Sequence, residues 1–302
     1  MTTELTELRF AGAAQGFNWL PLLVAENQGM FEKHGLKIEY LWLGSLDKAT
    51  SAVRDGDADF ALSAPEGAIT DYVSGGDLRI VGANSLGVPM SMVASPEIGS
   101  LAELRGKRIG TSSLKEGTAI YVQMMLQREG LSYPEDYDFV LSGLHTARWE
   151  ALHRGEIDCA PQPAPWNFLA EREGYRRIGE VNDVIGEMVF AAIIGSHDWI
   201  SKHRETAGRL IAGLAQAHDF VNDPANEAIS LPIYQSVTVA DDPDLAAKAL
   251  AYTRSMRMWP KDLRISPAAS ESTTDLMIRA GLLEEEHRAK AAGAFDRSFI
   301  PA

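Results

Sequence analysis

The sequence predicts an α/β protein of two lobes, each a mostly parallel sheet flanked by helices, with a helical C-terminal region. Three observations support this prediction. Strand-like and helix-like segments alternate over the first two thirds of the chain, which is typical of parallel sheets. A ten-residue segment recurs 99 positions later, about one α/β domain further on. The 302 residues also reach the length, roughly 250–300 residues, at which a single core stops growing.

The expected elements follow from the spacing of apolar residues. In the first part of the chain we expect strands at Leu5–Ala11, Leu36–Leu43, Phe60–Ser63 and Leu78–Asn84. The helices between them are expected at Trp19–Gln28, Leu46–Arg54 and Glu66–Val73. The pattern then restarts, with strands at Val88–Ala94, Arg108–Thr111, Asp138–Leu141, Ile157–Ala160 and Met188–Ile194. Its helices are expected at Gly117–Arg128, Ala147–Arg154 and Trp166–Glu173. The segment from about 199 to 292 has a helical period and almost no strand pattern.

The recurring segment is Ala52–Ala61, which aligns without gaps to Ala151–Ala160. Each copy contains the end of a helix, a glycine that can adopt the left-handed cap, an aspartate and a short buried strand. We therefore interpret the chain as two lobes of similar topology.

Composition excludes several classes of function. The chain has 28 basic and 42 acidic residues, a net charge of −14, and no segment rich in lysine or arginine. Phosphate backbones and anionic lipid surfaces would repel it, so we expect no nucleic-acid partner. The single cysteine, Cys159, excludes an intramolecular disulfide and a cysteine-rich zinc site. Apolar runs such as Phe190–Ile194 are far shorter than the ~20 residues of a membrane span.

Candidate binding residues follow the predicted strands, because ligands of open parallel sheets bind beyond the carboxyl ends of the strands. These segments supply amide, hydroxyl, aromatic and carboxylate groups at Gln15, Phe17, Asn18, Trp19, Ser45, Ser63, Glu66, Thr111, Ser112 and Gln162. The turns contain one basic residue, Lys115. They therefore favour a neutral, zwitterionic or aromatic ligand over a simple inorganic anion.

Alternative roles stay open for several of these residues. Ser63 with Glu66, and Ser113 with Glu116, have the spacing of capping boxes, which would satisfy their own helices. Aromatic rings such as Phe17 and Trp19 near strand ends stack on flat ligands or fill the core.

Known catalytic motifs are absent from the sequence: there is no His-Glu-x-x-His, Gly-x-Ser-x-Gly, Walker loop or Gly-x-Gly-x-x-Gly after a strand. We expect neither a metal nor a cofactor. The weak catalytic candidates are Glu66, His145 and Cys159. Cys159 aligns with Phe60 in the repeat, which favours a small buried side chain over a nucleophile.

A family resemblance adds to this interpretation. The segment Phe17–Ile38, with Pro21, Gly29 and Gly35, resembles the opening of the nitrate/sulfonate/taurine-type solute-binding proteins of ABC transporters. Their superfamily also holds the thiamine-pyrimidine synthases. Later segments agree in the right order, including 100–110 and 155–158, so that the resemblance covers about residues 6–200.

The resemblance implies a two-lobed periplasmic-binding-protein-like fold of type II. Lobe one would comprise residues 1–88 plus 190–302, and lobe two residues 89–189. The hinge strands would lie near 88–94 and 188–194. The protein would bind a small organic solute between the lobes, close over it, and act as the monomeric substrate-binding component of an ABC importer, with a permease as its partner.

Two other functions stay open on the same scaffold. One is a cytoplasmic enzyme, decarboxylase- or lyase-like or of thiamine-pyrimidine synthesis, and the other is a ligand-sensing module. The synthase's cysteine-rich motif has no counterpart here, and the related desulfinase has its cysteine where this chain has Asn18. The N-terminal residues do not resemble an export signal. We therefore expect a cytoplasmic protein, or a periplasmic one if a signal peptide has been removed.

Overall fold

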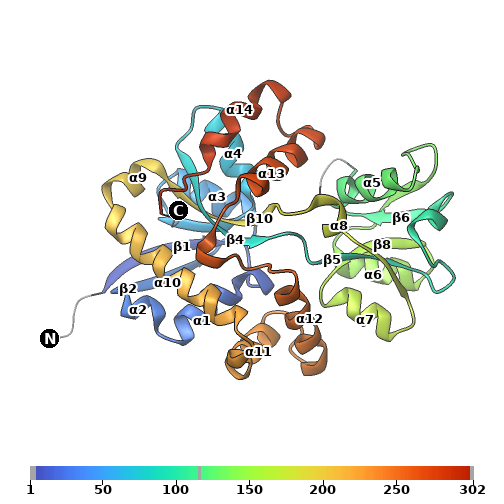
Figure 1. Ribbon diagram of the computed structural model, residues 1–302, viewed down its shortest axis with the longest axis horizontal. Coiled ribbons are helices and arrows are strands. Elements are labelled where there is room, and N and C mark those ends of the chain that lie inside the picture. The colour runs from blue at the N-terminus through green and yellow to red at the C-terminus, as the bar shows by residue number, and fades with distance from the viewer. Residues whose placement is uncertain (1–4, 115–116, 300–302) are drawn as a thin grey trace.

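The computed structural model describes residues 5–114 and 117–299, which form two five-stranded sheets, one in each lobe (Figure 1). The strand order is β2-β1-β3-β10-β4 in the first lobe and β7-β6-β8-β5-β9 in the second. In each sheet one strand, β10 or β5, runs antiparallel to both of its neighbours, and the remaining strands share one direction. The predicted two-lobed α/β fold is confirmed.

The first lobe is built mainly by the beginning of the chain. Its strands are β1 (Thr6–Gly12), β2 (Leu36–Trp42), β3 (Phe60–Ser63), β4 (Leu78–Leu86) and β10 (Val189–Ser196). Its first helices are η1 (Phe17–Trp19), α1 (Leu20–Asn27), α2 (Met30–Lys33), α3 (Leu46–Arg54) and α4 (Pro65–Val73). In Figure 1, α3 and α4 cover one face of the sheet, and α1 and α2 cover the other.

The second lobe repeats this arrangement. Its strands are β5 (Met90–Ala94), β6 (Arg108–Thr111), β7 (Asp138–Leu141), β8 (Cys159–Pro163) and β9 (Arg176–Glu180). Its helices are η2 (Leu101–Leu104), α5 (Thr118–Arg128), α6 (His145–His153), α7 (Trp166–Arg172) and α8 (Asn182–Ile185). Sequence analysis missed β9, α8 and α2. The two helices have only four residues each, and β9, Arg-Arg-Ile-Gly-Glu, lacks a clear alternation of apolar residues.

Within the described residues, the chain after β10 forms helices and no further strand, as expected. These are α9 (His197–Lys202), α10 (Arg204–Asn222), η3 (Pro224–Asn226), α11 (Glu227–Ser236), α12 (Pro243–Ser255), η4 (Lys261–Leu263), α13 (Pro267–Arg279), η5 (Glu285–His287), α14 (Arg288–Ala291) and η6 (Ala292–Ala294). They pack mainly on the first lobe (Figure 1). Nowhere in the described ranges is a helix long and apolar enough to traverse a bilayer.

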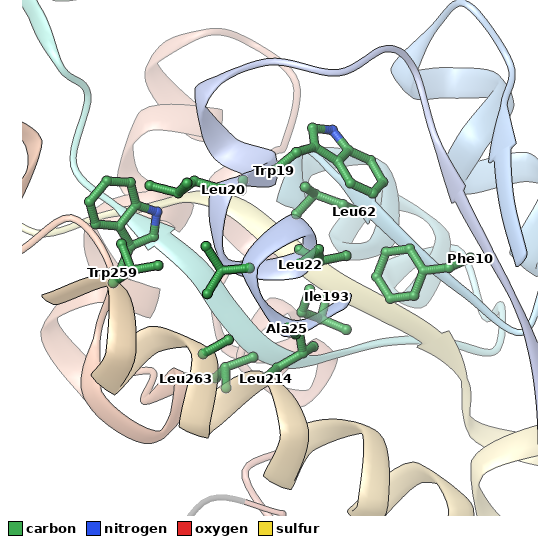
Figure 2. Packing of buried hydrophobic residues seen from close by; sticks show 14 of the residues in the cluster. Phe10, Trp19, Leu20, Leu22, Ala25, Leu62, Ile193, Leu214, Trp259 and Leu263 are labelled. Carbon is green, nitrogen blue, oxygen red and sulfur yellow. The ribbon is translucent and has the colours of Figure 1, made fainter. Parts of the chain in front are cut away.

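The core of the first lobe has one hydrophobic cluster on each face of its sheet. On the side of α1 and α10, Phe10, Trp19, Leu62 and Ile193 are buried together, as Figure 2 shows. The other cluster joins α3, α4 and α13 to the opposite face. Both faces of the parallel strands are thus covered, which explains why β3, Phe-Ala-Leu-Ser, is fully buried.

The sequence repeat corresponds to a repeated ion pair. Arg9 donates through its backbone N to Asp59 Oδ2 at 2.8 Å and through Nη2 to Oδ1 at 2.8 Å. Exactly 99 residues later, Arg108 makes the same two bonds to Asp158, also at 2.8 Å each. Each pair joins an arginine of a central strand, Arg9 in β1 or Arg108 in β6, to the aspartate that directly precedes the parallel neighbouring strand. The two lobes therefore share detailed geometry as well as strand order.

The chain crosses between the two sheets twice, once between β4 and β5 and once between β9 and β10. The strands predicted near 88–94 and 188–194 occur as β5 and β10, and each lies inside a sheet. The connecting segments are hydrogen-bonded to each other. Asn182 Oδ1 accepts from Val88 N at 2.7 Å, and Gly87 N donates to Met188 O at 2.9 Å.

Candidate ligand-binding cleft

Two adjoining cavities lie between the lobes. The inner cavity has a volume of about 210 Å³ and the outer one about 880 Å³. They share the wall residues Leu46, Ser63, Ala64 and Glu66. We call the two cavities together the cleft.

Each lobe contributes a wall to the cleft. The first lobe supplies the loop after β1, the end of β3 and the first turns of α3 and α4. The second lobe supplies Tyr121 on α5, with Ser112 and Ser113 after β6. Because β1 and β3 are parallel neighbours, their carboxyl ends open at the same edge, as the sequence analysis assumed.

Aromatic side chains form much of the inner cavity. The rings of Phe17 and Phe190 stack with centroids 6.2 Å apart and planes 4° from parallel. Trp19 also reaches the cavity wall, but it is 4% exposed and packs edge-on against Phe10 and Trp42. Phe17 thus contributes mainly to the cleft, whereas Trp19 contributes mainly to the core.

Asn18 connects the loop after β1 to strand β4 through two hydrogen bonds. Its backbone oxygen accepts from Asn84 Nδ2 at 2.7 Å, and its side-chain Oδ1 accepts from Ser85 Oγ at 3.1 Å. Both partners are fully buried polar residues. Neither residue was among the predicted site residues. Asn84 ends the predicted strand Leu78–Asn84 and Ser85 follows it, so a polar pair at a strand end was a usable signal.

Ser63 and Glu66 lie on the cleft wall but do not form the predicted capping box. The N-cap of α4 is Ala64, which leaves Ser63 on the strand. The Ser63 hydroxyl accepts from Thr50 Oγ1 at 2.8 Å and donates to Leu46 O at 3.1 Å. Glu66 and Tyr121 of the other lobe both line the inner cavity, and burial together with the charge of Glu66 raises the pKa of this tyrosine.

In the second lobe, neighbouring hydroxyls have different positions. Ser112 is exposed on the outer cavity wall. Thr111 is fully buried, and its Oγ1 donates to Ser113 O at 2.8 Å and lies 2.7 Å from Thr118 Oγ1. Helix α5 begins at Thr118 with Gly117 as its N-cap, so Ser113 is not the N-cap residue of this helix. Lys115 and Glu116 lie outside the described residues.

Besides Thr111, three predicted ligand-binding residues are not among the residues that line the two cavities. Gln15 lines a separate cavity of about 350 Å³ with Glu26 and Ile233. Ser45 caps α3 by accepting from Lys48 N at 3.2 Å. Gln162 is fully buried on β8, and its side-chain amide can hydrogen-bond to His145 O and Trp149 N in the backbone of α6.

The remaining catalytic candidates, His145 and Cys159, are also not among the residues that line the two cavities. His145 is half-buried beside the Trp166 ring, and burial lowers its pKa. Cys159 is fully buried, and burial raises the pKa of its thiol well above the usual range. A buried, protonated thiol is a poor nucleophile. The described part of the chain brings together no group of three or more histidine, cysteine, aspartate or glutamate residues that could hold a metal ion.

The two lobes and their two five-stranded sheets make up the periplasmic-binding-protein fold. The alkanesulfonate-binding protein SsuA of Xanthomonas axonopodis pv. citri, solved bound to MOPS, superposes with a TM-score of 0.70 at 20% identity, covering 97% of this chain and 99% of that one. The chain belongs to the NMT1/THI5-like family, which matches residues 16–228. The resemblance seen in the sequence is confirmed.

Two curated relatives are named for different activities. One is a candidate binding protein of Brucella abortus (strain 2308), 26% identical over 231 residues, which are 75% of this chain and 70% of the relative. The other is the 4-amino-5-hydroxymethyl-2-methylpyrimidine phosphate synthase of Uromyces fabae, 25% identical over 286 residues, which are 88% of this chain and 80% of that enzyme.

Proposed function

We propose that this protein binds a small organic solute in the cleft, closes its lobes over the solute, and acts as the substrate-binding component of an ABC importer. The observation that carries this proposal is the composition of the cleft, whose walls come from both lobes. A ligand that contacts both walls stabilises the arrangement in which the lobes approach each other. We propose residues 1–88 and 190–302 as lobe one and 89–189 as lobe two, with the two connecting segments as the hinge.

The cleft favours a neutral, zwitterionic or aromatic solute. Among the described residues lining the inner cavity, Glu66 is the one charged side chain, and most of the others are apolar or aromatic. The outer cavity adds Asp47, Asp71 and Arg54, so acidic groups predominate there as well. Apolar walls with a few polar groups are typical of organic ligand sites. A nitrate or sulfate ion would be repelled by the carboxylates.

The relatives support a binding role and suggest the partner. The similar Brucella protein is named as a candidate binding protein, and SsuA is a structural neighbour that binds a sulfonate compound, MOPS. By analogy, the closed form would be delivered to a membrane permease as a monomer. Fold analogy alone does not identify the solute.

The Uromyces relative favours a second candidate, an enzyme of pyrimidine synthesis on the same scaffold. The chemistry of the cleft supports it less well. Cys159 is buried, and His145 is not among the residues that line the cleft.

A thermal-shift screen against a few hundred metabolites tests the proposal. A solute present at 100 times its dissociation constant adds about 2.7 kcal/mol to the free energy of unfolding, which raises the melting temperature by a few degrees. Each stabilising solute is then recovered and analysed by mass spectrometry. Recovery of an unchanged solute supports binding and transport, whereas a chemically transformed one would establish the enzyme instead.

Two amino-acid substitutions test whether the solute binds in the cleft. Glu66→Gln should change the affinity for the stabilising solute, because Glu66 lines both cavities. The matched control is Glu129→Gln, an exposed carboxylate at the end of α5 that is not among the residues lining the cleft. Equal affinities for both variants would show that the solute binds elsewhere.

A further inference from the structure

A cavity of about 620 Å³ adjoins the two connections between the lobes. Leu86, the last residue of β4, lines it together with Glu187, which lies between α8 and β10. The rest of its wall comes from the ends of α10 and α12 and from the segment 257–266. The described residues that line it are all different from those that line the cleft. We call this cavity the connection pocket.

Basic side chains predominate in the wall of the connection pocket. The basic wall residues are Arg254, Arg257, Lys261 and Arg264, and the acidic ones are Glu187 and Asp262. Four of the eleven described wall residues are thus basic, whereas the whole chain has 28 basic residues in 302 and a net charge of −14. The cleft has the opposite balance, with more acidic than basic wall residues. A concentration of positive charge in one concave wall attracts anions.

Arg254 is the most buried of the basic wall residues, with a side chain that is 10% exposed. Its Nε donates to Val221 O at 2.8 Å, and its Nη1 donates to Glu227 Oε2 at 2.8 Å. Its Nη2 is buried and has no hydrogen-bond acceptor among the described residues. A buried donor without an acceptor destabilises a protein. Because Arg254 lines the pocket, a ligand oxygen at this wall would supply the missing acceptor.

Backbone strain is concentrated in the same wall. Within the described ranges, the non-glycine residues with positive φ are Arg257 at 52°, Asp262 at 56° and Leu263 at 52°. Arg257 directly follows the C-cap of α12. Its backbone N donates to Arg254 O at 2.9 Å, and Met258 N donates to Thr253 O at 3.2 Å. These two bonds define a helix cap in which glycine is preferred at the position of Arg257. Strained residues of this kind cluster at functional sites.

Hydrogen bonds join the pocket wall to both connections between the lobes. Leu86 N donates to Met258 O at 2.7 Å, and Ser266 Oγ donates to Glu187 Oε2 at 2.9 Å. The segment 257–266 is therefore anchored near both of its ends. An anchored wall loses little conformational freedom when a ligand binds, which favours binding.

We propose that the connection pocket binds a small organic or inorganic anion with a carboxylate or phosphate group, at a site separate from the cleft. The exposed charges of Arg257 and Lys261 contact this group, and Arg254 supplies a further donor. Arginine binds the paired oxygens of carboxylates and phosphates through parallel N–H donors. The cavity volume lies within the range of about 300–1,000 Å³ that is typical of small-molecule sites. This site does not depend on the proposed function of the cleft.

The test is isothermal titration calorimetry of the full chain with inorganic phosphate and, separately, with succinate, at constant ionic strength. The wild type should bind at least one of them, and Arg257→Gly and Lys261→Gln should each bind it about tenfold more weakly, because one charged contact is lost. Arg257→Gly should not lower the melting temperature, since relief of the strained φ offsets the greater freedom of glycine in the unfolded chain. The matched control is Lys33→Gln, which removes an exposed lysine on α2 that does not line the pocket.

Binding of phosphate alone or of succinate alone would identify which of the two groups the site takes. Three results would overturn the inference. The first is that neither anion binds the wild type, and the second is that Arg257→Gly or Lys261→Gln retains the wild-type affinity. The third is that Lys33→Gln weakens binding as much as the pocket variants do, which would assign the binding to the overall charge of the protein.

Discussion

At the scale of residues, Thr111 and Ser112 are adjacent hydroxyls with separate roles. Thr111→Ala should lower the free energy of unfolding by about 1–3 kcal/mol, because it removes two buried hydrogen bonds, to Ser113 O and Thr118 Oγ1. Ser112→Ala should lower it by less, about 0.5–1 kcal/mol, because Ser112 is exposed although its hydroxyl lies 3.2 Å from Thr118 Oγ1, and it should weaken solute binding. Urea unfolding and a solute titration of both variants check this. The prediction fails if the two variants lose stability equally.

His218 should make stability depend on pH. It is fully buried on α10, its Nδ1 lies 2.8 Å from Pro260 O, and burial lowers its pKa to about 4. The unfolded chain binds this proton near its ordinary pKa of about 6.5, so the unfolded state gains protons first as the pH falls. The stability contribution is complete above about pH 6.5 and declines toward pH 4.

The measurement is the melting temperature of the wild type and of His218→Gln between pH 7.5 and pH 4. Carboxylates titrate near the lower end of this range in both proteins. The difference between the two curves therefore gives the contribution of His218 to the pH dependence of stability. We expect the wild type to lose relative stability at up to about 1.4 kcal/mol per pH unit. Parallel curves for the two proteins would contradict the assignment.

At the scale of elements, α12 joins the two lobes through α7 and β9. Lys248 Nζ lies 3.0 Å from Glu171 Oε2, and the Tyr252 hydroxyl donates to Glu180 Oε2 at 2.6 Å. The Phe168 ring, 3% exposed, packs edge-on against Tyr252 with centroids 5.2 Å apart. The contact is therefore an apolar centre surrounded by polar pairs.

The packing of Phe168 should contribute more to the stability of this contact than the ion pair of Lys248 does. Phe168→Ala should lower the free energy of unfolding by about 3–5 kcal/mol, the usual effect of a large cavity. Lys248→Ala should cost less than about 1 kcal/mol, because its ion pair with Glu171 is half-exposed. Denaturant titrations of both variants measure this. Similar losses of stability in the two variants would show that the ion pair of Lys248 contributes as much to this contact as the packing of Phe168 does.

At the scale of the whole molecule, the proposed hinge predicts a change of shape. The two lobes are joined by two short connections (Figure 1), which are hydrogen-bonded to each other. The walls of the cleft come from both lobes. A saturating solute should therefore reduce the radius of gyration, measured by small-angle X-ray scattering. The same solute should leave the scattering of a cleft-filled Ala64→Trp variant unchanged. An unaltered radius in the wild type would exclude closure by the lobes.

The sequence by itself determined the two sheets, their repeated topology and the sheet edge at which the cleft opens. Alternating apolar segments and the 99-residue repeat are local signals, and the bounds of α3, β3, β6 and β7 agree with the prediction. Six of the ten proposed binding residues line the cleft: Phe17, Asn18, Trp19, Ser63 and Glu66 line the inner cavity, and Ser112 lines the outer one. Strand ends are predictable because parallel neighbours open at one edge.

Only the tertiary structure decided which side chains reach the cleft. Gln15, Thr111 and Gln162 follow or end strands as the wall residues do, but the paths of their loops and strands direct them elsewhere. Tyr121 and Phe190 reach the inner cavity from α5 and from the returning strand β10, so no local pattern marks them. The physical reason is that strand and helix formation depends on neighbours along the chain, whereas the composition of a cleft depends on how two separately folded lobes are placed against each other.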